Sequence, residues 1–320
     1  MKGKQNIVIL SGTKNCDPFL ISKKKEYKQY LLLNGKPVVS YVIDAALSAK
    51  CVNKIFIIAD PAKMRKVLSF YSSHQRARIH VVENQESLLQ SIFFCFTEYT
   101  QTGVLLPSDA PFLTSKSIDA FIGKIPDTAD YVIGFTNGRK LDAIFSKAAL
   151  FVKKEAIKYG LFPIHDAQIR ISNLHYLDFT HVSSLEQKLA SSVFENRKLL
   201  DEHGRKNRKS WRRIAGACLL YIHQRHYHPA ILLGAVLTGF AAFCFYVAHK
   251  TRHSMFEKIY AFPLRPAFFS FVLTLLTGYK LTCVALVTED LAPMLDIDVV
   301  ETYLLLTKNN HFEELCALLR

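Results

Sequence analysis

Short apolar runs alternate with amphipathic stretches along the first part of the chain. A continuous apolar run bounded by polar or turn residues is typical of a buried strand. Such runs predict strands over residues 7–10, 54–59, 78–82, 104–107 and 131–135. Between them, apolar side chains recur at helical spacing, which predicts helices over 38–50, 62–71, 87–97 and 115–122. Strands that alternate with helices in this way favour a parallel α/β sheet with right-handed crossovers.

The pattern changes after about residue 175. Residues 183–213 have helical periodicity and become strongly basic, and 229–248 form an apolar run without a charged residue. A second apolar run, 268–276, is shorter, and the chain then returns to a strand-like segment at 283–287 and a helical one at 299–306. We therefore expect a core over 1–182, a helical, basic and apolar insertion over 183–281, and a return to the core over 282–320.

The apolar run 229–248 is long enough to span a bilayer, and basic residues and histidines flank it on both sides. Two interpretations stay open. The run is either a helix buried within the insertion, or part of a surface that associates with an anionic membrane through residues 197–250. The histidines that precede it, His223, His226 and His228, have a spacing that fits no standard metal site.

Composition narrows the class of protein. Half of the residues are hydrophobic and 21% are charged, which excludes wholesale disorder, and a net charge of +14 favours anionic partners. The seven cysteines have no zinc or redox spacing and predict reduced core thiols. No apolar leader precedes the first strand, so we expect a cytoplasmic location, with the cytoplasmic membrane face as the alternative above. Aromatic residues are sparse in the basic stretch, so no nucleic acid is expected as a partner.

Residues 104–114 contain the strongest candidate in the sequence for a functional side chain. A buried strand stops at Pro107 and is followed by a single carboxylate, Asp109, and then by Pro111. In an open α/β sheet, ligands bind at the carboxyl ends of the strands, where a carboxylate can hold Mg²⁺. An ordinary turn-capping aspartate is the alternative. No G-x-G-x-x-G and no G-K-[ST] motif follows the first strand, so neither a dinucleotide fold nor a P-loop is supported.

Four stretches follow one another in a familiar order: 7–12, 28–37, 105–114 and 295–298. The second contains Lys28 and a Leu-Leu-Leu-Asn-Gly-Lys-Pro run, the third contains Leu-Pro-Ser-Asp-Ala-Pro-Phe, and the fourth is Leu-Asp-Ile-Asp. This order resembles the molybdenum-cofactor-type nucleotidyltransferases, in a subgroup with a long helical insert. The resemblance implies a glycosyltransferase-A-like fold, which is a three-layer α/β sandwich with a mostly parallel central sheet, here with a helical insertion.

The resemblance also implies a site. Mg²⁺ would be held by Asp109 together with Asp296 or Asp298, and Lys28 would contact the phosphates. The loop that wraps the nucleotide would consist of Leu10, Ser11, Gly12, Thr13 and Lys14. Asn84 and Ser87 would lie near the base. Arg170 and Asn173 are a weaker pair of candidates for contact with the acceptor. Each of these residues also has a purely structural interpretation. Lys28 would be a solvated lysine, Asp296 and Asp298 would cap a helix, and residues 170–173 would form a surface hairpin.

The activity so implied is that of a Mg²⁺-dependent nucleotidyltransferase. It would join a nucleoside triphosphate to a small phosphorylated or hydroxylated acceptor and release pyrophosphate. Two departures from the family pattern keep a second hypothesis open: Gly12 is the only glycine of the first loop, and Thr302 stands where the family closes with an aspartate. The second hypothesis is a catalytically inactive nucleotide-binding or membrane-tethered scaffold with the same fold.

Overall fold

The computed structural model of the protein describes residues 3–11, 27–137, 162–164, 167–195, 208–224, 281–288, 290–295 and 311–319, with a few isolated positions. The chain divides into two compact units. The first consists of Met1–Asp178 and Val284–Arg320, and the second of Phe179–Cys283. The first unit holds the sheet and most of the predicted site residues.

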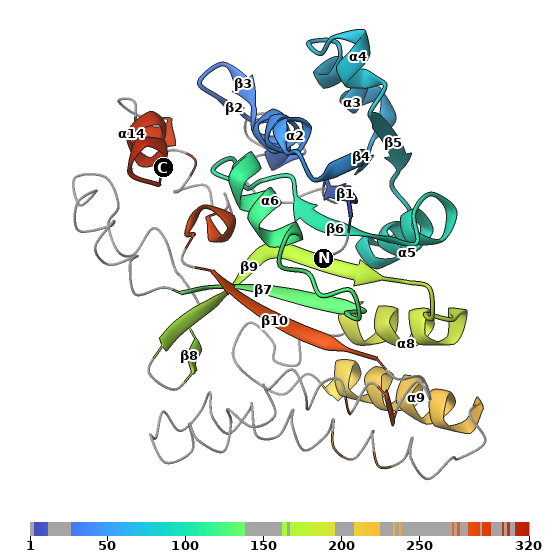
Figure 1. The fold of residues 1–320 in the computed structure, drawn as a ribbon. Coiled ribbons are helices and arrows are strands. Elements are labelled where there is room, and N and C mark those ends of the chain that lie inside the picture. Colours follow the sequence, from blue (N-terminus) through green and yellow to red (C-terminus); the bar gives the residue numbers. More distant parts are fainter. Residues whose placement is uncertain are drawn as a thin grey trace. The chain divides into compact units, whose positions relative to one another are not determined.

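An eight-stranded sheet forms the centre of the first unit, with the order β10-β7-β9-β6-β1-β4-β5 and with β8 beside β9 (Figure 1). The neighbouring strands β6, β1, β4 and β5 are parallel. This confirms the predicted α/β class and its mostly parallel sheet. The strands are β1 (Gln5–Leu10), β4 (Val52–Ala59), β5 (Ile79–Glu83), β6 (Thr102–Pro107), β7 (Tyr131–Asn137), β8 (Phe162–Ile164), β9 (Ala167–Asp178) and β10 (Cys283–Thr288).

β9 is the main feature of the sheet that the sequence pattern did not predict. It runs antiparallel to both of its neighbours, β6 and β7, and lies between them. Buried and half-buried residues alternate along it, with Ser172, Leu174 and Tyr176 on the buried side. Polar residues interrupt its apolar positions, so the segment lacks the continuous apolar run by which the parallel strands were found.

Helices cover the sheet of the first unit and supply its core. They are α2 (Val38–Ser48), α3 (Pro61–Leu68), α4 (Ser73–Arg76), α5 (Leu88–Glu98), α6 (Ser115–Ile122) and α14 (His311–Leu319). Ile9 and Leu106 of the central strands share one buried cluster with Val42 of α2 and Ile118 of α6. Each such side chain, when fully buried, contributes about 1.5–3 kcal/mol. The core therefore fixes α2 and α6 against β1 and β6, the strands that lead to the site.

A tight hairpin precedes α2 and sets its start. β2 (Leu32–Leu33) pairs antiparallel with β3 (Lys36–Pro37), and the turn residues Asn34 and Gly35 have φ values of +48° and +75°. An Asn-Gly pair with both φ values positive is the preferred two-residue hairpin turn. Pro37 is the N-cap residue of α2. The backbone N–H of Val38, the first residue of the helix, bonds to the carbonyl of Leu31 at 3.0 Å.

A second buried cluster joins the end of the chain to the segment that follows Asp109. Phe112 packs in it with Leu295 and with Phe312 of α14. The rings of Phe112 and Phe312 are 5.2 Å apart. Leu295, the residue before Asp296, therefore packs in the same cluster as the loop that follows β6. Asp296 and Asp298 themselves lie outside the described residues, as does most of the predicted helix 299–306.

The second unit contains two described helices, α8 (Ser184–Glu195) and α9 (Arg208–Gln224), where the pattern predicted one helical stretch over 183–213. The hydroxyl of Tyr221 on α9 donates to a carboxylate oxygen of Glu186 on α8 at 2.9 Å. The apolar runs 229–248 and 268–276 lie outside the described residues except for isolated positions. Among the residues that are described, no helix combines the length and the apolar character needed to cross a membrane.

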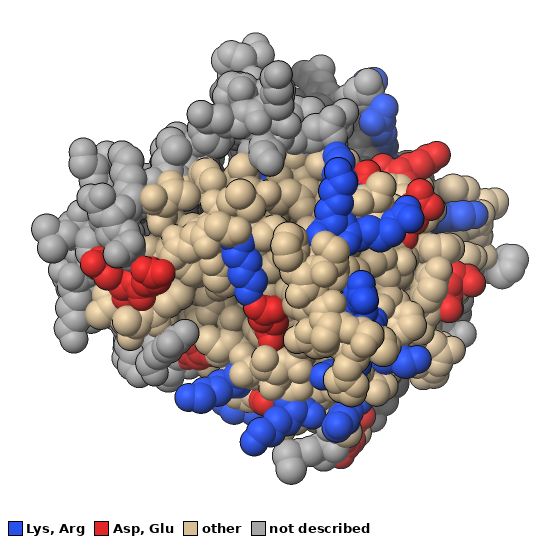
Figure 2. Space-filling model, turned by 90° about the horizontal axis from the view of Figure 1, so that it is seen from above, with Lys and Arg blue, Asp and Glu red and all other residues tan. Residues whose placement is uncertain are grey.

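Charges of both signs are spread over the first unit. On the face drawn in Figure 2, the described Lys and Arg side chains lie at several separate places, with Asp and Glu side chains between them. The excess of positive charge in the sequence therefore does not gather into one patch among the described residues of this face. The distribution of charge on this face does not by itself indicate an anion site.

Gly134 of β7 is expected to tolerate no side chain. The pairing of β7 with β9 is irregular between Ile133 and Phe135, and a Cβ at position 134 would lie 2.2 Å from Ser172 Oγ and 2.7 Å from the Leu174 carbonyl oxygen. The carbonyl belongs to the backbone and cannot rotate away. We expect Gly134→Ala to lower the free energy of unfolding by about 1–3 kcal/mol, measured by urea denaturation.

The control for this substitution is Gly216→Ala. A Cβ at position 216 of α9 would meet no atom within 4 Å. Because alanine is a better helix former than glycine, this change should leave stability unaltered or raise it by up to about 1 kcal/mol. Equal destabilisation by both substitutions would contradict the steric explanation at Gly134.

Candidate active site

The site is built at the carboxyl ends of two adjacent parallel strands. β1 and β6 are paired in register up to Leu10 and Pro107, and the backbone N–H of Ser108 bonds to the carbonyl of Leu10 at 3.1 Å. Neighbouring strands lie about 4.8 Å apart, so Ser11 and Asp109 leave the sheet side by side. This is the edge at which open α/β sheets bind their ligands.

Lys28 and Asp109, the two predicted catalytic residues, form an ion pair at this edge. The ammonium group of Lys28 contacts the Oδ2 atom of Asp109. The side chains are 27% and 12% exposed, respectively, so the pair is largely withdrawn from water. A pair in such surroundings is screened less by salt than a surface pair, and each member is costly to leave without its partner. The fold thus brings together a cation and a carboxylate that are far apart in the sequence.

Gln29 fixes the position of Lys28. The short helix η1 (Lys28–Tyr30) contains both residues, and Gln29 is only 2% exposed. Its amide nitrogen Nε2 donates a hydrogen bond of 2.7 Å to the backbone carbonyl of Ser11. This bond ties η1 to the end of β1 and thereby holds Lys28 over Asp109. Gln29 was not predicted from the sequence, because a glutamine within a basic run does not by itself indicate a role.

Two buried hydroxyl groups lie at the same end of β1. Ser11 is 1% exposed, and its Oγ and the hydroxyl of Tyr30 lie close enough to influence each other, but neither makes a hydrogen bond of good geometry to a described residue. Burial raises the pKa of Tyr30 to about 12, so its hydroxyl is neutral at physiological pH. A buried hydroxyl without a partner costs about 1–3 kcal/mol, and such groups are common where a ligand completes the bonding.

The predicted base-binding residues lie at the end of β5, two strands away from β1. This corresponds to about 10 Å along the edge of the sheet. Ser87 caps α5: its Oγ accepts from the N–H of Gln90 at 3.2 Å, and the Gln90 side chain accepts from the N–H of Ser87 at 3.0 Å. This reciprocal capping box gives Ser87 a structural role. Contact of Asn84 or Ser87 with a base stays a prediction.

Arg170 and Asn173 lie within β9, in the interior of the sheet rather than in a loop. Arg170 is paired in register with Thr136 of β7. β8 pairs antiparallel with the start of β9, where Ile164 lies opposite Ala167, before Arg170 and Asn173 in the chain. Contact of Arg170 or Asn173 with an acceptor stays a prediction.

The described residues supply one carboxylate for Mg²⁺ but no complete set of protein ligands. No group of three or more His, Cys, Asp or Glu side chains able to hold a metal occurs among them. Mg²⁺ needs no such cage, because it takes one or two carboxylates and completes its shell with substrate phosphates and water. Asp109 supplies one carboxylate at the right edge of the sheet. Its predicted co-ligands Asp296 and Asp298, and the loop residues Gly12, Thr13 and Lys14, lie outside the described residues.

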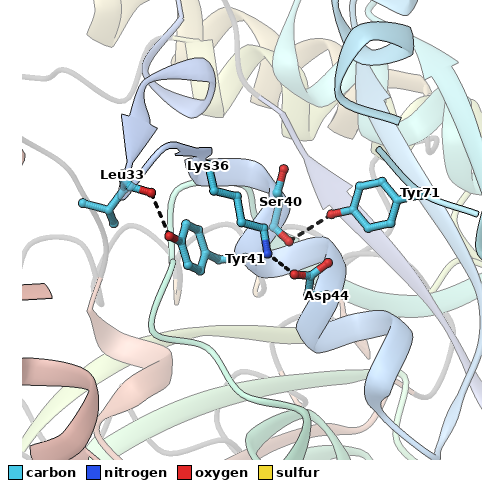
Figure 3. Close-up of polar contacts among 6 residues, drawn as sticks. All are labelled: Leu33, Lys36, Ser40, Tyr41, Asp44 and Tyr71. Carbon is cyan, nitrogen blue, oxygen red and sulfur yellow. Dashed lines mark hydrogen bonds and ion pairs between the residues drawn. The ribbon is translucent and has the colours of Figure 1, made fainter. Parts of the chain in front are cut away.

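A second lysine–aspartate pair lies on the outer side of α2, and its role is structural. Lys36 of β3 contacts Asp44 of α2, and its ammonium group is 4.7 Å from the centre of the Tyr41 ring (Figure 3). The hydroxyl of Tyr41 in turn donates to the Leu33 carbonyl at 2.7 Å. These contacts fasten the hairpin to the helix. Asp44 is 45% exposed, which makes it a suitable control for Asp109.

A cavity of about 540 Å³ lies beyond this pair, between α2, the loop that follows Asp109, and α14. Tyr41, Asp44, Phe112 and Glu313 line it, whereas Lys28 and Asp109 do not. It is therefore a neighbour of the candidate site and not part of it.

Substitution of Gln29 is expected to act through Lys28. Gln29→Leu removes the bond to Ser11, so η1 should loosen and Lys28 should lose its fixed position; we expect kcat for pyrophosphate release to fall about tenfold. In a Lys28→Met background the same substitution should have little further effect, because both changes remove one interaction. The measurement is a double-mutant cycle on kcat. The control is Gln75→Leu at an exposed cap of α4. Fully additive effects of Gln29→Leu and Lys28→Met would contradict a positioning role.

Comparison with known proteins identifies the family of the chain. The family described as MobA-like NTP transferase domain matches residues 22–237, a stretch that includes both Lys28 and Asp109. A hypothetical transferase from Thermus thermophilus is 16% identical in sequence and has a TM-score of 0.56, over 93% of this chain and 98% of that one. At that identity the likeness concerns the fold alone.

Two further solved structures are more distant. A 4-diphosphocytidyl-2C-methyl-D-erythritol synthase from Anaerococcus prevotii is 11% identical, with a TM-score of 0.40 over 58% of this chain and 76% of that one. A putative glucose-1-phosphate thymidylyltransferase from Bacillus anthracis is 13% identical, with a TM-score of 0.38 over 59% and 74%. Comparison with curated proteins found no match. Since the family match covers well over half of the sequence, the chain belongs to the MobA-like NTP transferase domain family and is a nucleotidyltransferase.

Proposed function

We propose that the protein is a Mg²⁺-dependent nucleotidyltransferase that joins a nucleoside triphosphate to a small phosphorylated or hydroxylated acceptor and releases pyrophosphate. The observation that carries the proposal is the ion pair between Lys28 and Asp109 at the carboxyl ends of β1 and β6. Each member has the chemistry that one half of a magnesium–triphosphate complex requires. The carboxylate suits the cation, and the ammonium group suits the phosphate oxygens.

In the proposed reaction an acceptor oxygen attacks the α-phosphorus. A new phosphorus–oxygen bond forms while the bond from the α-phosphorus to the bridging oxygen breaks, and pyrophosphate leaves with that oxygen. A hydroxyl acceptor gives its proton to solvent, whereas a phosphate acceptor has none to lose. Such transfers depend on positioning and charge neutralisation more than on a protein nucleophile. Lys28, held by Gln29, would neutralise a phosphate oxygen at a fixed point.

Asp109 would hold Mg²⁺, with Asp296 or Asp298 as predicted co-ligands. When bound, the metal would supply positive charge to the phosphate oxygens. Without nucleotide, Lys28 and Asp109 balance each other. Binding of a magnesium–nucleotide complex would give each side chain a new partner, and neither charge would be left alone in a partly buried place.

The rest of the nucleotide would extend along the edge of the sheet, from β6 towards β5. The buried hydroxyls of Ser11 and Tyr30, which make no well-formed hydrogen bond to a described residue, offer neutral donors and acceptors next to the ion pair. Asn84 and Ser87 would lie near the base at the far end. On the opposite side, β9 neighbours β6, so Arg170 and Asn173 are the candidates for the acceptor.

The test is thermal stability followed by turnover. The protein is melted with ATP, GTP, CTP or UTP, each with and without Mg²⁺, and pyrophosphate release is then measured with sugar phosphates and with alcohols as acceptors. Ligand at a hundred times its Kd stabilises the folded state by about 2.7 kcal/mol, which is readily seen as a higher Tm. Mg²⁺-dependent stabilisation together with pyrophosphate release supports the proposal. Stabilisation without release supports the inactive-scaffold hypothesis, and stabilisation by no nucleotide overturns both.

A further inference from the structure

One side of α9 in the second unit is a continuous exposed face. Its exposed residues follow the spacing of a single helical side: Arg212, Arg213, Gly216, Leu219, Leu220, His223. Leu219 is 66% exposed and Leu220 is 56% exposed, whereas an isolated leucine of a folded protein is more often buried. The two arginines lie towards the start of the helix, and the two leucines follow them two turns later. The face is thus both basic and apolar.

The other side of α9 is held against α8, so this face has a fixed orientation on its helix pair. Tyr221 is 2% exposed, and its hydroxyl bonds to Glu186 of α8. Leu219 and Leu220 precede it directly in the sequence but point elsewhere. Because both leucines are exposed, they take no part in this contact between the two helices.

The sequence around α9 favours a strongly anionic partner. From His203 to Phe256 the chain has no aspartate and no glutamate, but it has nine lysines and arginines. A basic stretch alone would suit nucleic acid and lipid headgroups equally. The adjacent apolar leucines distinguish the two, because an interfacial helix inserts apolar side chains below the headgroups while its arginines contact them.

We propose that the exposed face of α9 binds the surface of an anionic lipid bilayer, with Arg212 and Arg213 contacting headgroups and Leu219 and Leu220 entering the interface. The inference is independent of the catalytic proposal, since it uses no residue of the sheet edge. It requires no membrane-spanning helix. It gives the second unit a function of its own, which is to place the enzyme at a membrane surface.

The experiment uses the full chain and vesicles of defined composition. Binding is measured by co-sedimentation with vesicles of phosphatidylcholine containing 30% phosphatidylglycerol, and with pure phosphatidylcholine as the neutral comparison. We expect binding to the anionic vesicles only, and weaker binding at high salt.

Substitutions separate the two parts of the face. An arginine near an anionic surface strengthens binding about fivefold, so Arg212→Gln with Arg213→Gln should lower the partition coefficient about thirtyfold. Leu219→Gln with Leu220→Gln should lower it at least about tenfold. The control removes the same charge elsewhere, by Lys66→Gln on α3 and Arg76→Gln on α4, both exposed, and should change binding less than about twofold.

Three results would overturn the proposal. These are equal binding to neutral and anionic vesicles, wild-type binding by both α9 variants, and an RNA oligonucleotide that displaces the protein from anionic vesicles through the same arginines. Far-ultraviolet circular dichroism and thermal melting of each variant establish that it is folded, so that weakened binding reports on the face and not on unfolding. Binding lost in both α9 variants and kept in the control supports it.

Discussion

Asp109→Asn is expected to lower kcat/KM for pyrophosphate release by about a thousandfold, which corresponds to about 4 kcal/mol of transition-state stabilisation. Asparagine has nearly the same shape as aspartate, but it carries no charge and is a poor ligand for Mg²⁺. Asp109 is 8% exposed and lies at the edge where β1 and β6 end, so few other groups can replace it. The measurement is steady-state turnover over a range of Mg²⁺ concentrations, with the nucleotide that gives the largest thermal shift.

The matched control for this substitution is Asp44→Asn. Asp44 is also paired with a lysine, but it lies on the outer side of α2 and is 45% exposed (Figure 3). An exposed pair contributes only about 0–1 kcal/mol to stability, so this variant should keep wild-type turnover and nearly wild-type Tm. Mg²⁺-dependent stabilisation by nucleotide should vanish in Asp109→Asn and persist in Asp44→Asn. If both variants turn over at the wild-type rate, the assignment of Asp109 to the metal is wrong.

The parallel part of the fold could be predicted because most residues of its central strands β1, β4 and β6 are buried or half-buried on both faces. Such strands are continuous apolar runs, and β1, β4, β5 and β6 were each found to within a few residues. α6 was predicted at its observed bounds, because its apolar residues Ile118, Phe121 and Ile122 follow helical spacing and Thr114 precedes it as an N-cap.

The strands β7 and β10 were predicted over 131–135 and 283–287, but β9, which makes this part of the sheet antiparallel, was not. β9 pairs with β6 and β7, which are distant in sequence, and its alternating pattern resembles that of a surface hairpin. Short helices were also missed. α4 has only four residues and no buried side chain, so it leaves no apolar periodicity to detect.

The site was predictable where a charge stood beside a strand end. Asp109 follows β6 directly, and Lys28 was placed by resemblance to the family's motif. The roles of Gln29, Ser11 Oγ and the Tyr30 hydroxyl follow only from tertiary structure. Gln29 bonds to the end of β1, and the two hydroxyls are buried without a well-formed hydrogen bond to a described residue. A sequence states which groups are present, but not which of them the fold leaves unsatisfied.

Lys28→Met is expected to lower kcat/KM about a hundredfold and to weaken nucleotide binding as well. Methionine keeps much of the volume of lysine but removes the positive charge, so the phosphate loses a charged contact worth about 1.5–3 kcal/mol. Lys28→Arg should recover part of the loss, because it keeps the charge at a slightly different reach. The measurements are kcat/KM and the Kd of a non-hydrolysable nucleotide analogue, with Lys36→Met of the structural pair as the control.

A double-mutant cycle with Asp109→Asn separates the two roles that Lys28 can have. If Lys28 only neutralises Asp109, its removal should cost nothing further once the carboxylate is gone, and the double variant should bind nucleotide as Asp109→Asn does. If Lys28 contacts phosphate, the double variant should bind nucleotide more weakly than Asp109→Asn, even without Mg²⁺. We expect the second result, because Gln29 fixes Lys28 to the end of β1 through a buried bond that charge neutralisation alone would not require.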